Sequence, residues 1–268
     1  MVIELLSRLA RVRVTVGYAT ALLTVATTLL VLGPQTQEQV IRNASTNLHN
    51  LSHGHLATLL GSAFVPDAAG GPVYLWLPGL VCLLALAELL WRSGRLALVF
   101  AVGHIGATLL VATGLTAALK LGWLPVSVSF ARDVGMSYGA AAVLGALTAA
   151  IPARWRPAWI GWWVSVALGT AALCADFTDV GHATAVLLGM LVATRLGGPT
   201  RWTRVRYALL AVSAVFGFVV LAHTGVSVLA GVGLGTLGAV AADRIARRRW
   251  ARRSLAVPLV TAQPALSR

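Results

Sequence analysis

Apolar residues in this chain are gathered into long, almost uninterrupted stretches separated by short polar segments. Eight stretches can be marked, each roughly 16 to 22 residues long, close to the about 20 residues that a helix needs to cross a bilayer. They are Val14–Leu32, Val73–Leu90, Leu96–Leu115, Val134–Ile151, Trp159–Ala175, Val180–Leu196, Tyr207–Ala222 and Val226–Ala242. Only His223-Thr224-Gly225 separates the last two stretches, and together they are too long for one span, so the pattern predicts a tight hairpin there.

The composition excludes a soluble domain. The chain is 58% hydrophobic and only 11% charged, with a mean hydropathy of +0.82, whereas soluble domains contain about 25% charged residues. We therefore expect an all-α, polytopic membrane helix bundle. The net charge of +13 does not indicate nucleic-acid binding, because the basic residues lie between the apolar stretches rather than along one polar face.

The basic residues predict the orientation in the membrane. With the N-terminus in the cytoplasm, 18 of the 21 basic residues fall on the inside and the other 3 outside, as the positive-inside rule requires. The three outside are Arg42, Lys120 and Arg132. An even number of spans also places the Arg-rich tail inside, where we expect it to bind anionic lipid. The richness in Ala, Gly and Arg is typical of a high-GC bacterium, so a bacterial plasma membrane is the expected location.

Two connections on the outer side are long, 33–72 and 116–133. Apolar residues at helical spacing in the first of them predict helix in, or dipping into, the outer interface: Leu48, Leu51, Leu56, Leu59, Leu60 and Phe64. The same loop contains His49, His53 and His55, but no carboxylate or cysteine lies within 41–65. Neither a metal site nor a cofactor is therefore expected.

The tripeptide Asp-Val-Gly occurs twice, at Asp133 and at Asp179, each time at the head of an apolar stretch. A carboxylate at such a place can accept hydrogen bonds from the free N–H groups of the first turn, so we expect both aspartates to be N-caps. Ser137 follows four residues after the first, and His182 three residues after the second. Both stretches run from outside to inside, so the two side chains are expected at similar depth, about one turn below the outer surface.

Small residues continue both helices at a spacing of four. The two sets are Ser137, Ala141 and Gly145 on one helix, and Ala185, Gly189 and Ala193 on the other. Such stripes let membrane helices approach closely, and if they pack together, Ser137 and His182 meet above the contact. A serine bonded to its own helix backbone is the common alternative, whereas an ionisable histidine in a span is functional by default.

The residues around this serine and histidine resemble motifs of the rhomboid family of intramembrane serine proteases. Gly135-Met136-Ser137-Tyr138-Gly139 is similar to the family's GxSG motif at the head of the fourth span, although Gly139 stands one position later than the motif glycine. Gly181-His182, followed by Gly189, is similar to the sixth-span histidine and its glycine-bearing helix. Glu88 with Ser93-Gly94 resembles the inner end of the family's second span.

The resemblance covers about 40–200, and the last two apolar stretches lie beyond its six-span core. Together with the apolar pattern it divides the chain into three parts. A rhomboid-like six-span membrane domain occupies 1–200 and includes the long outer loop 33–72. An additional two-span hairpin follows at 201–243, and a basic cytoplasmic tail at 244–268.

The resemblance implies a Ser–His dyad open to the outer face, with Ser137 as the nucleophile and His182 as the general base. Its substrates would be membrane-anchored proteins. The HxxxN pair that rhomboids usually carry on the second span is absent, because Val73–Leu90 has neither His nor Asn. The oxyanion donors therefore stay open. The candidates are the backbone N–H of Ser137 and the side chains of Asn50, His53, His55 and His104.

Two other classes of function remain open. The missing HxxxN favours a catalytically inactive rhomboid-like protein that binds or escorts membrane clients. A transporter with a coincidental motif would need a polar pathway, yet Glu88 lies at the inner end of its stretch and no acid lies in the middle of a span.

Overall fold

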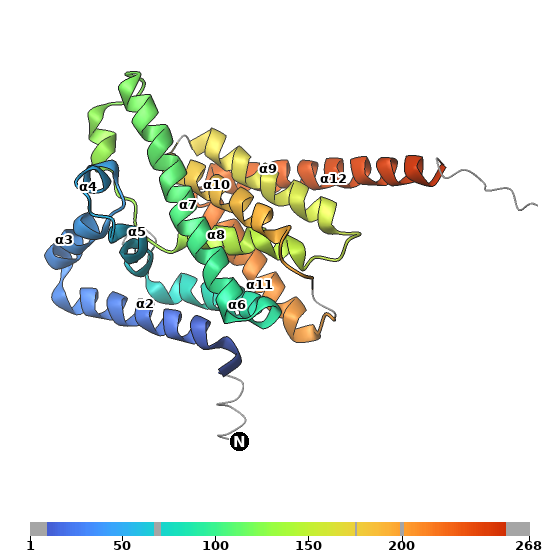
Figure 1. Ribbon diagram of the computed structural model, residues 1–268, viewed down its shortest axis with the longest axis horizontal. Helices are drawn as coiled ribbons and strands as arrows, with labels where there is room; N and C mark the ends of the chain where they lie inside the picture. Colours follow the sequence, from blue (N-terminus) through green and yellow to red (C-terminus); the bar gives the residue numbers. More distant parts are fainter. Residues whose placement is uncertain (1–9, 67–70, 175, 199–200, 256–268) are drawn as a thin grey trace, which may run out of the picture.

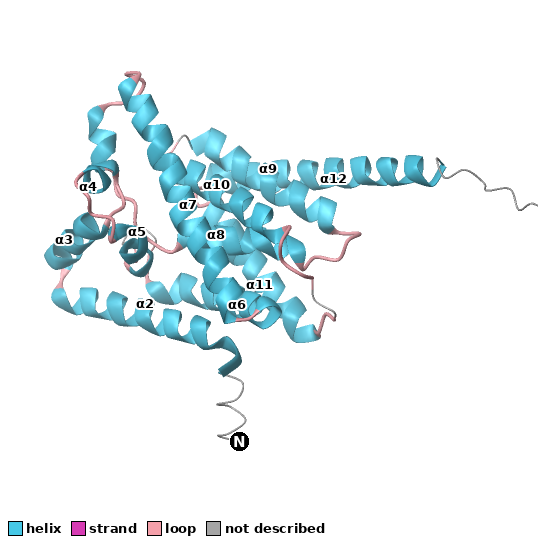
Figure 2. Cartoon of the chain, viewed as in Figure 1, coloured by secondary structure: helices cyan, strands magenta, loops and turns pink. Residues whose placement is uncertain are grey.

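The structure is a computed structural model that describes residues 10–66, 71–174, 176–198 and 201–255. All regular secondary structure in these ranges is helical (Figures 1 and 2). The predicted all-α membrane bundle is therefore confirmed.

Each of the eight predicted stretches forms a helix. Within the described ranges, six helices are long and apolar enough to cross a membrane: α2 (Arg13–Leu32), α6 (Val73–Trp91), α7 (Ser93–Lys120), α9 (Arg156–Cys174), α11 (Arg204–Leu221) and α12 (Gly225–Leu255). Two apolar helices are shorter: α8 (Ser137–Ala146), which a 3-10 turn at Leu147–Ala149 continues, and α10 (Phe177–Ala193).

The two short helices are the ones that carry Ser137 and His182. The 10 residues of α8 and the 3 of its 3-10 turn reach only about 20 Å, because a helical residue rises about 1.5 to 2 Å. The hydrocarbon core of a bilayer is about 30 Å thick. Helix α8 with its 3-10 turn is therefore too short to cross the hydrocarbon core by itself.

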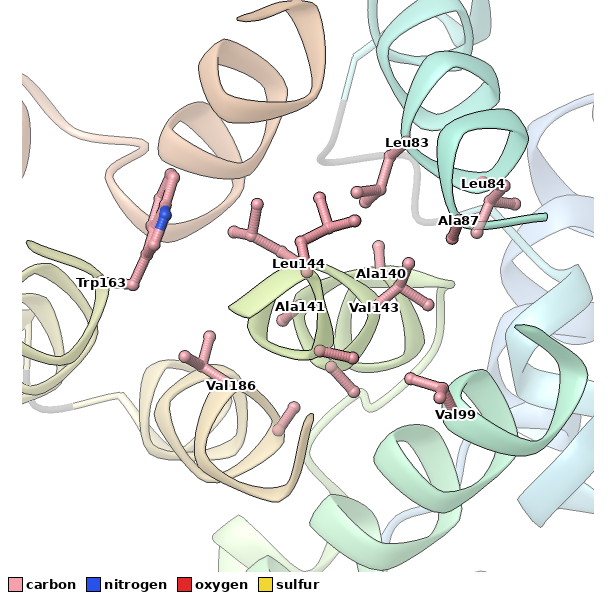
Figure 3. Close-up of a cluster of buried hydrophobic side chains, with 14 of the residues drawn as sticks. Leu83, Leu84, Ala87, Val99, Ala140, Ala141, Val143, Leu144, Trp163 and Val186 are labelled. Carbon is pink, nitrogen blue, oxygen red and sulfur yellow. The ribbon is translucent and has the colours of Figure 1, made fainter. Parts of the chain in front are cut away.

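Helix α8 lies in the middle of the bundle, and its residues Tyr138–Ala146 are all buried. Figure 3 shows side chains of four other helices around it: Leu83, Leu84 and Ala87 of α6, Val99 of α7, Trp163 of α9 and Val186 of α10. Every face of α8 is thus covered by protein, which makes it the axis of the core.

Short helices occupy the two long connections. In the first are α3 (Pro34–Ala44), α4 (Leu48–Ser52), α5 (Thr58–Gly61) and a 3-10 turn at Ser62–Phe64, and in the second a 3-10 turn at Val126–Phe130. Helix is thus present where the leucine spacing predicts it. In Figure 1, α3, α4 and α5 gather at the left end of the bundle, whereas α12 projects from its right end.

The last two helices, α11 and α12, are in close contact with the rest of the bundle. Phe216 of α11 lies over Gly79 of α6, where a Cβ on the glycine would come within 2.6 Å of it. Helix α12 meets α9 backbone to backbone, because a Cβ on Gly161 would collide with the carbonyl of Gly238. Small residues allow both contacts, as is usual between membrane helices.

Glu88 ties three helices together at the end of α6. It is 2% exposed and accepts hydrogen bonds from the N–H of Val14 (3.0 Å), the N–H and hydroxyl of Thr15 (2.9 and 2.7 Å) and the hydroxyl of Ser93 (2.6 Å). The carboxylate thereby satisfies free donors at the start of α2 and binds them to the start of α7.

We expect Glu88→Ala to destabilise the fold by about 2 to 3 kcal/mol, because it leaves several buried donors without acceptors. Thermal unfolding in detergent measures this. Glu38→Ala is the control, since it removes an exposed ion pair with Arg132 (2.7 Å), which contributes less than about 1 kcal/mol. Equal melting temperatures for the two variants would contradict the role given to Glu88.

Candidate active site at the outer ends of α8 and α10

Asp179 does not cap α10, contrary to the expectation from the sequence. The helix begins at Phe177, and its N-cap is Asp176, whose carboxylate accepts a hydrogen bond of 3.1 Å from the N–H of Thr178. Asp179 therefore lies within the first turn, and its side chain is fully buried. The helix begins three residues earlier than the Asp-Val-Gly motif predicts. Asp179 is therefore a buried carboxylate rather than a cap at the surface.

Asp133 does not cap α8 either, because α8 begins four residues later, at Ser137, and no side chain caps it. Instead, Asp133 binds the first outer loop: its N–H donates to the hydroxyl of Ser45 (2.8 Å), and its carbonyl accepts from the N–H of Thr46 (2.9 Å). Asp133 thus fixes the entry to α8.

The chain turns into α8 at Gly135, whose φ of +111° favours glycine. Ser137 is the first residue of the helix and is partly exposed. Tyr138, the next residue, is 3% exposed, and its ring meets the ring of His182 edge to face at 5.3 Å between centroids. Gly181 makes room for this ring, since a Cβ there would strike the Tyr138 phenol.

The predicted close contact between α8 and α10 is present, but α8 presents a partly different face to α10 than predicted. A Cβ on Gly189 would collide with the backbone of Ala142, and one on Gly145 with the carbonyl of Val186. Ala185 is fully buried beside them. The α8 residues on this face are therefore Ala142 and Gly145, with Tyr138 above them, rather than Ser137 and Ala141.

Gly139 serves the other side of α8. Phe100 of α7 lies over it, and a Cβ on Gly139 would collide with that ring. The motif glycine that stands one position late thus allows α7 to approach α8.

Ser137 and His182 are brought to the same end of neighbouring helices but are not hydrogen-bonded to each other. His182 is 8% exposed, and neither of its ring nitrogens has a hydrogen-bond partner among the described residues. A buried imidazole with two free nitrogens is unusual, and it leaves both nitrogens open for proton transfer. Catalytic hydrogen bonds are often long before substrate binds.

The four side chains suggested for the oxyanion have other surroundings. The amide of Asn50 donates to the carbonyls of Arg42 (2.9 Å) and Ser45 (2.8 Å), which uses both of its N–H groups within the loop. His53 and His55 are exposed. His104 is buried on α7, and its Nε2 lies 3.1 Å from the hydroxyl of Ser62. Both amide N–H groups of Asn50 are thus engaged within the loop, and the four side chains stay predictions as oxyanion donors.

Sequence reasoning missed His223, which it treated only as part of the hairpin turn. Its Nδ1 lies 3.8 Å from Oδ1 of Asp179, and Nδ1 of His182 lies 3.9 Å from the same oxygen. The sequence did predict that His223 lies in a turn on the outer side of the membrane, at a depth similar to that predicted for His182. No group of acids, histidines and cysteines within the described ranges could hold a metal ion.

One of three comparisons with known proteins found a match. The family model for rhomboid-like proteins matches residues 11–201, which include both Ser137 and His182. No curated protein and no solved structure matches the chain. Since the match covers well over half of the sequence, the chain belongs to the rhomboid-like protein family.

Proposed function

We propose that this protein is an intramembrane serine endopeptidase that cleaves membrane-anchored proteins, with Ser137 as nucleophile and His182 as general base. One observation carries the proposal: α8 and α10 are in backbone contact, and they carry a partly exposed serine at the first residue of α8 and a buried imidazole on α10 whose two nitrogens have no hydrogen-bond partner among the described residues. A nucleophile and a base on rigid, packed helices are what acyl transfer requires.

The reaction would proceed in two balanced steps. Ser137 Oγ bonds to the peptide carbonyl carbon while its proton moves to His182 and the carbonyl electron pair moves to oxygen. Breakage of the C–N bond then releases the amine, which takes the proton from the imidazolium. Water repeats the sequence on the acyl-serine ester and frees the enzyme.

The start of α8 supports stabilisation of the oxyanion. A helix leaves its first N–H groups without intrahelical partners, and no side chain caps α8. The N–H groups of Ser137 and its neighbours are thus available to a developing negative charge, and the positive end of the helix dipole favours it. This backbone supply reduces the need for the missing HxxxN pair.

A catalytically inactive, client-binding protein is the second candidate. The observation that favours it is Tyr138, whose ring packs against His182, while the hydroxyl of Ser137 makes no hydrogen bond to that histidine. In this function the helices would hold clients without cutting them.

The proposed site faces the outer side of the membrane. The α3–α5 segment lies at the left end of the bundle in Figure 1, and the projecting part of α12 with its arginines lies at the right end. Asp133, just before Ser137, is bonded to Ser45 and Thr46 between α3 and α4. The site is therefore at the end away from the basic tail, which the positive-inside rule places in the cytoplasm.

A membrane-impermeant, biotinylated fluorophosphonate tests these proposals together, because it reacts with activated serines. We expect it to label the wild type in right-side-out vesicles and not in sealed inverted ones. Ser137→Ala should abolish labelling, whereas the control Ser127→Ala, in the exposed second outer loop, should not. Labelling of Ser137→Ala would refute the nucleophile, and an unlabelled wild type would favour the client-binding candidate. Labelling in inverted vesicles alone would reverse the orientation.

A further inference from the structure

The carboxylate of Asp179 has no structural task that explains its burial. Its side chain is 0% exposed, and neither oxygen accepts a hydrogen bond from any described residue. Asp176 already caps the helix. Burial of a charge is unfavourable unless the charge is paired, so the groups around Asp179 must explain its presence.

Two imidazoles lie close enough to pair with the carboxylate when they carry a proton. Nδ1 of His182 and Nδ1 of His223 lie 3.9 and 3.8 Å from the same oxygen, Oδ1 of Asp179. His182 lies three residues after Asp179, on the same face of α10. His223 lies in the turn between α11 and α12. The three side chains form a row that begins in the bundle core and ends at the half-exposed His223, of which 49% is accessible.

We propose that Asp179 is a positioning residue for His182, and that His223 holds Asp179 in place. This inference rests on the proposed protease function. An acid beside Nδ1 favours the tautomer that carries the proton on Nδ1, which leaves Nε2 free to accept the proton of Ser137. The same acid then stabilises the imidazolium that forms. The dyad thereby becomes a row of four side chains.

The position of His223 is set by the cap of α12. The hydroxyl of Thr224 accepts from the N–H of Ser227 (3.1 Å), and the hydroxyl of Ser227 accepts from the N–H of Thr224 (2.9 Å). These reciprocal bonds fix the turn directly after His223. Helix α11 is held in turn by Leu144 of α8, which fills the space over Gly217.

The hairpin therefore contributes to the site although it lies beyond the family match, which ends at residue 201. A six-span core alone would contain Ser137, His182 and Asp179 but would lack the second partner of the carboxylate. The added helices thus complete the polar row.

The test uses the full-length protein and the same fluorophosphonate. The labelling rate is measured at increasing probe concentrations, which gives the maximal rate and the half-saturating concentration separately. Asp179→Asn should lower the maximal rate about 10- to 100-fold, with the half-saturating concentration and the melting temperature unchanged. The expected loss is smaller than the about 10⁴-fold that a hydrogen-bonded triad acid contributes, because Asp179 lies 3.9 Å from Nδ1 of His182. Asp176→Asn is the matched control, because it removes the same charge from the same turn and Asn still caps; its labelling should equal the wild type.

His223→Gln provides the second variant, on a half-exposed turn where folding is not at risk. It should lower the maximal rate about 3- to 10-fold, and in combination with Asp179→Asn it should cost little more than Asp179→Asn alone. Wild-type rates in Asp179→Asn, or a fully additive double variant, would overturn the inference while Ser137-dependent labelling left the protease proposal standing. A wild type that never labels would overturn both.

Discussion

Ser137→Ala and His182→Ala should each reduce cleavage of a membrane-anchored reporter by at least about ten-thousandfold, and the double variant should lose little more than either single one. Members of one catalytic unit are not additive, because the unit fails as soon as one of them is missing. Cleavage is measured by the appearance of the released fragment in membranes containing equal amounts of each variant.

The geometry explains why Ser137→Ala should otherwise fold normally. Ser137 is at the first position of α8 and forms none of the close helix contacts, which Gly145 and Ala142 make further along. Tyr138→Phe is a suitable control, because it keeps the ring that packs against His182. Full cleavage by Ser137→Ala would refute the dyad, and strictly additive losses would show that the two residues act independently.

The fold could be predicted because the membrane imposes strong constraints on the sequence. Helices such as α2 and α6 begin and end close to the predicted ranges, since each must present about 20 apolar residues to lipid. The same constraint does not hold for α8, whose residues are covered by protein. Its predicted start at Val134 is three residues early, because apolar residues continue into the segment that leads to the helix.

The capping prediction failed for a related reason. Whether an aspartate caps a helix depends on its exact position at the boundary, and apolar patterns locate boundaries only to within a few residues. Asp179 lies two residues inside α10, and this shift changes it from a surface cap into a buried partner of His182. The sequence shows that residue 179 is an aspartate, but it does not show that its side chain is buried.

On the face of α8 that contacts α10, Gly145 lies where it was predicted, but Ala142 and Tyr138 take the places predicted for Ala141 and Ser137. A stripe at a spacing of four can start at any of several neighbouring residues, and successive residues differ by about 100° around the helix. Positions 140, 141 and 142 are all alanine, so the sequence does not show which of them contacts α10. The contact of Gly189 with Ala142 does, and it places Tyr138 rather than Ser137 against His182.

His223 shows the limit of motif comparison. Motifs of the six-span family cannot assign a role to a residue outside that core, and a histidine in a short turn has no periodic signal. Only the packing of α11 and α12 on the bundle brings it to Asp179. Residues from the added hairpin should therefore be considered part of the site.

Gly189→Leu should be the most destabilising single change in the bundle. Overpacking typically costs about 1 to 3 kcal/mol, and here the neighbour that must move is the backbone of Ala142, which a Cβ would strike directly. We therefore expect a loss of about 3 kcal/mol or more by thermal unfolding in detergent, and a smaller but clear loss for Gly189→Ala. The separation of α8 from α10 should also abolish fluorophosphonate labelling. Gly114→Leu is the matched control: Gly114 lies in α7, and a Cβ there meets nothing within 4 Å. It makes the same chemical change on an exposed helix face, so it should retain both stability and labelling. If Gly189→Leu behaved like Gly114→Leu, α8 and α10 would not be in backbone contact, and the packing that holds the helices of Ser137 and His182 side by side would have to be abandoned.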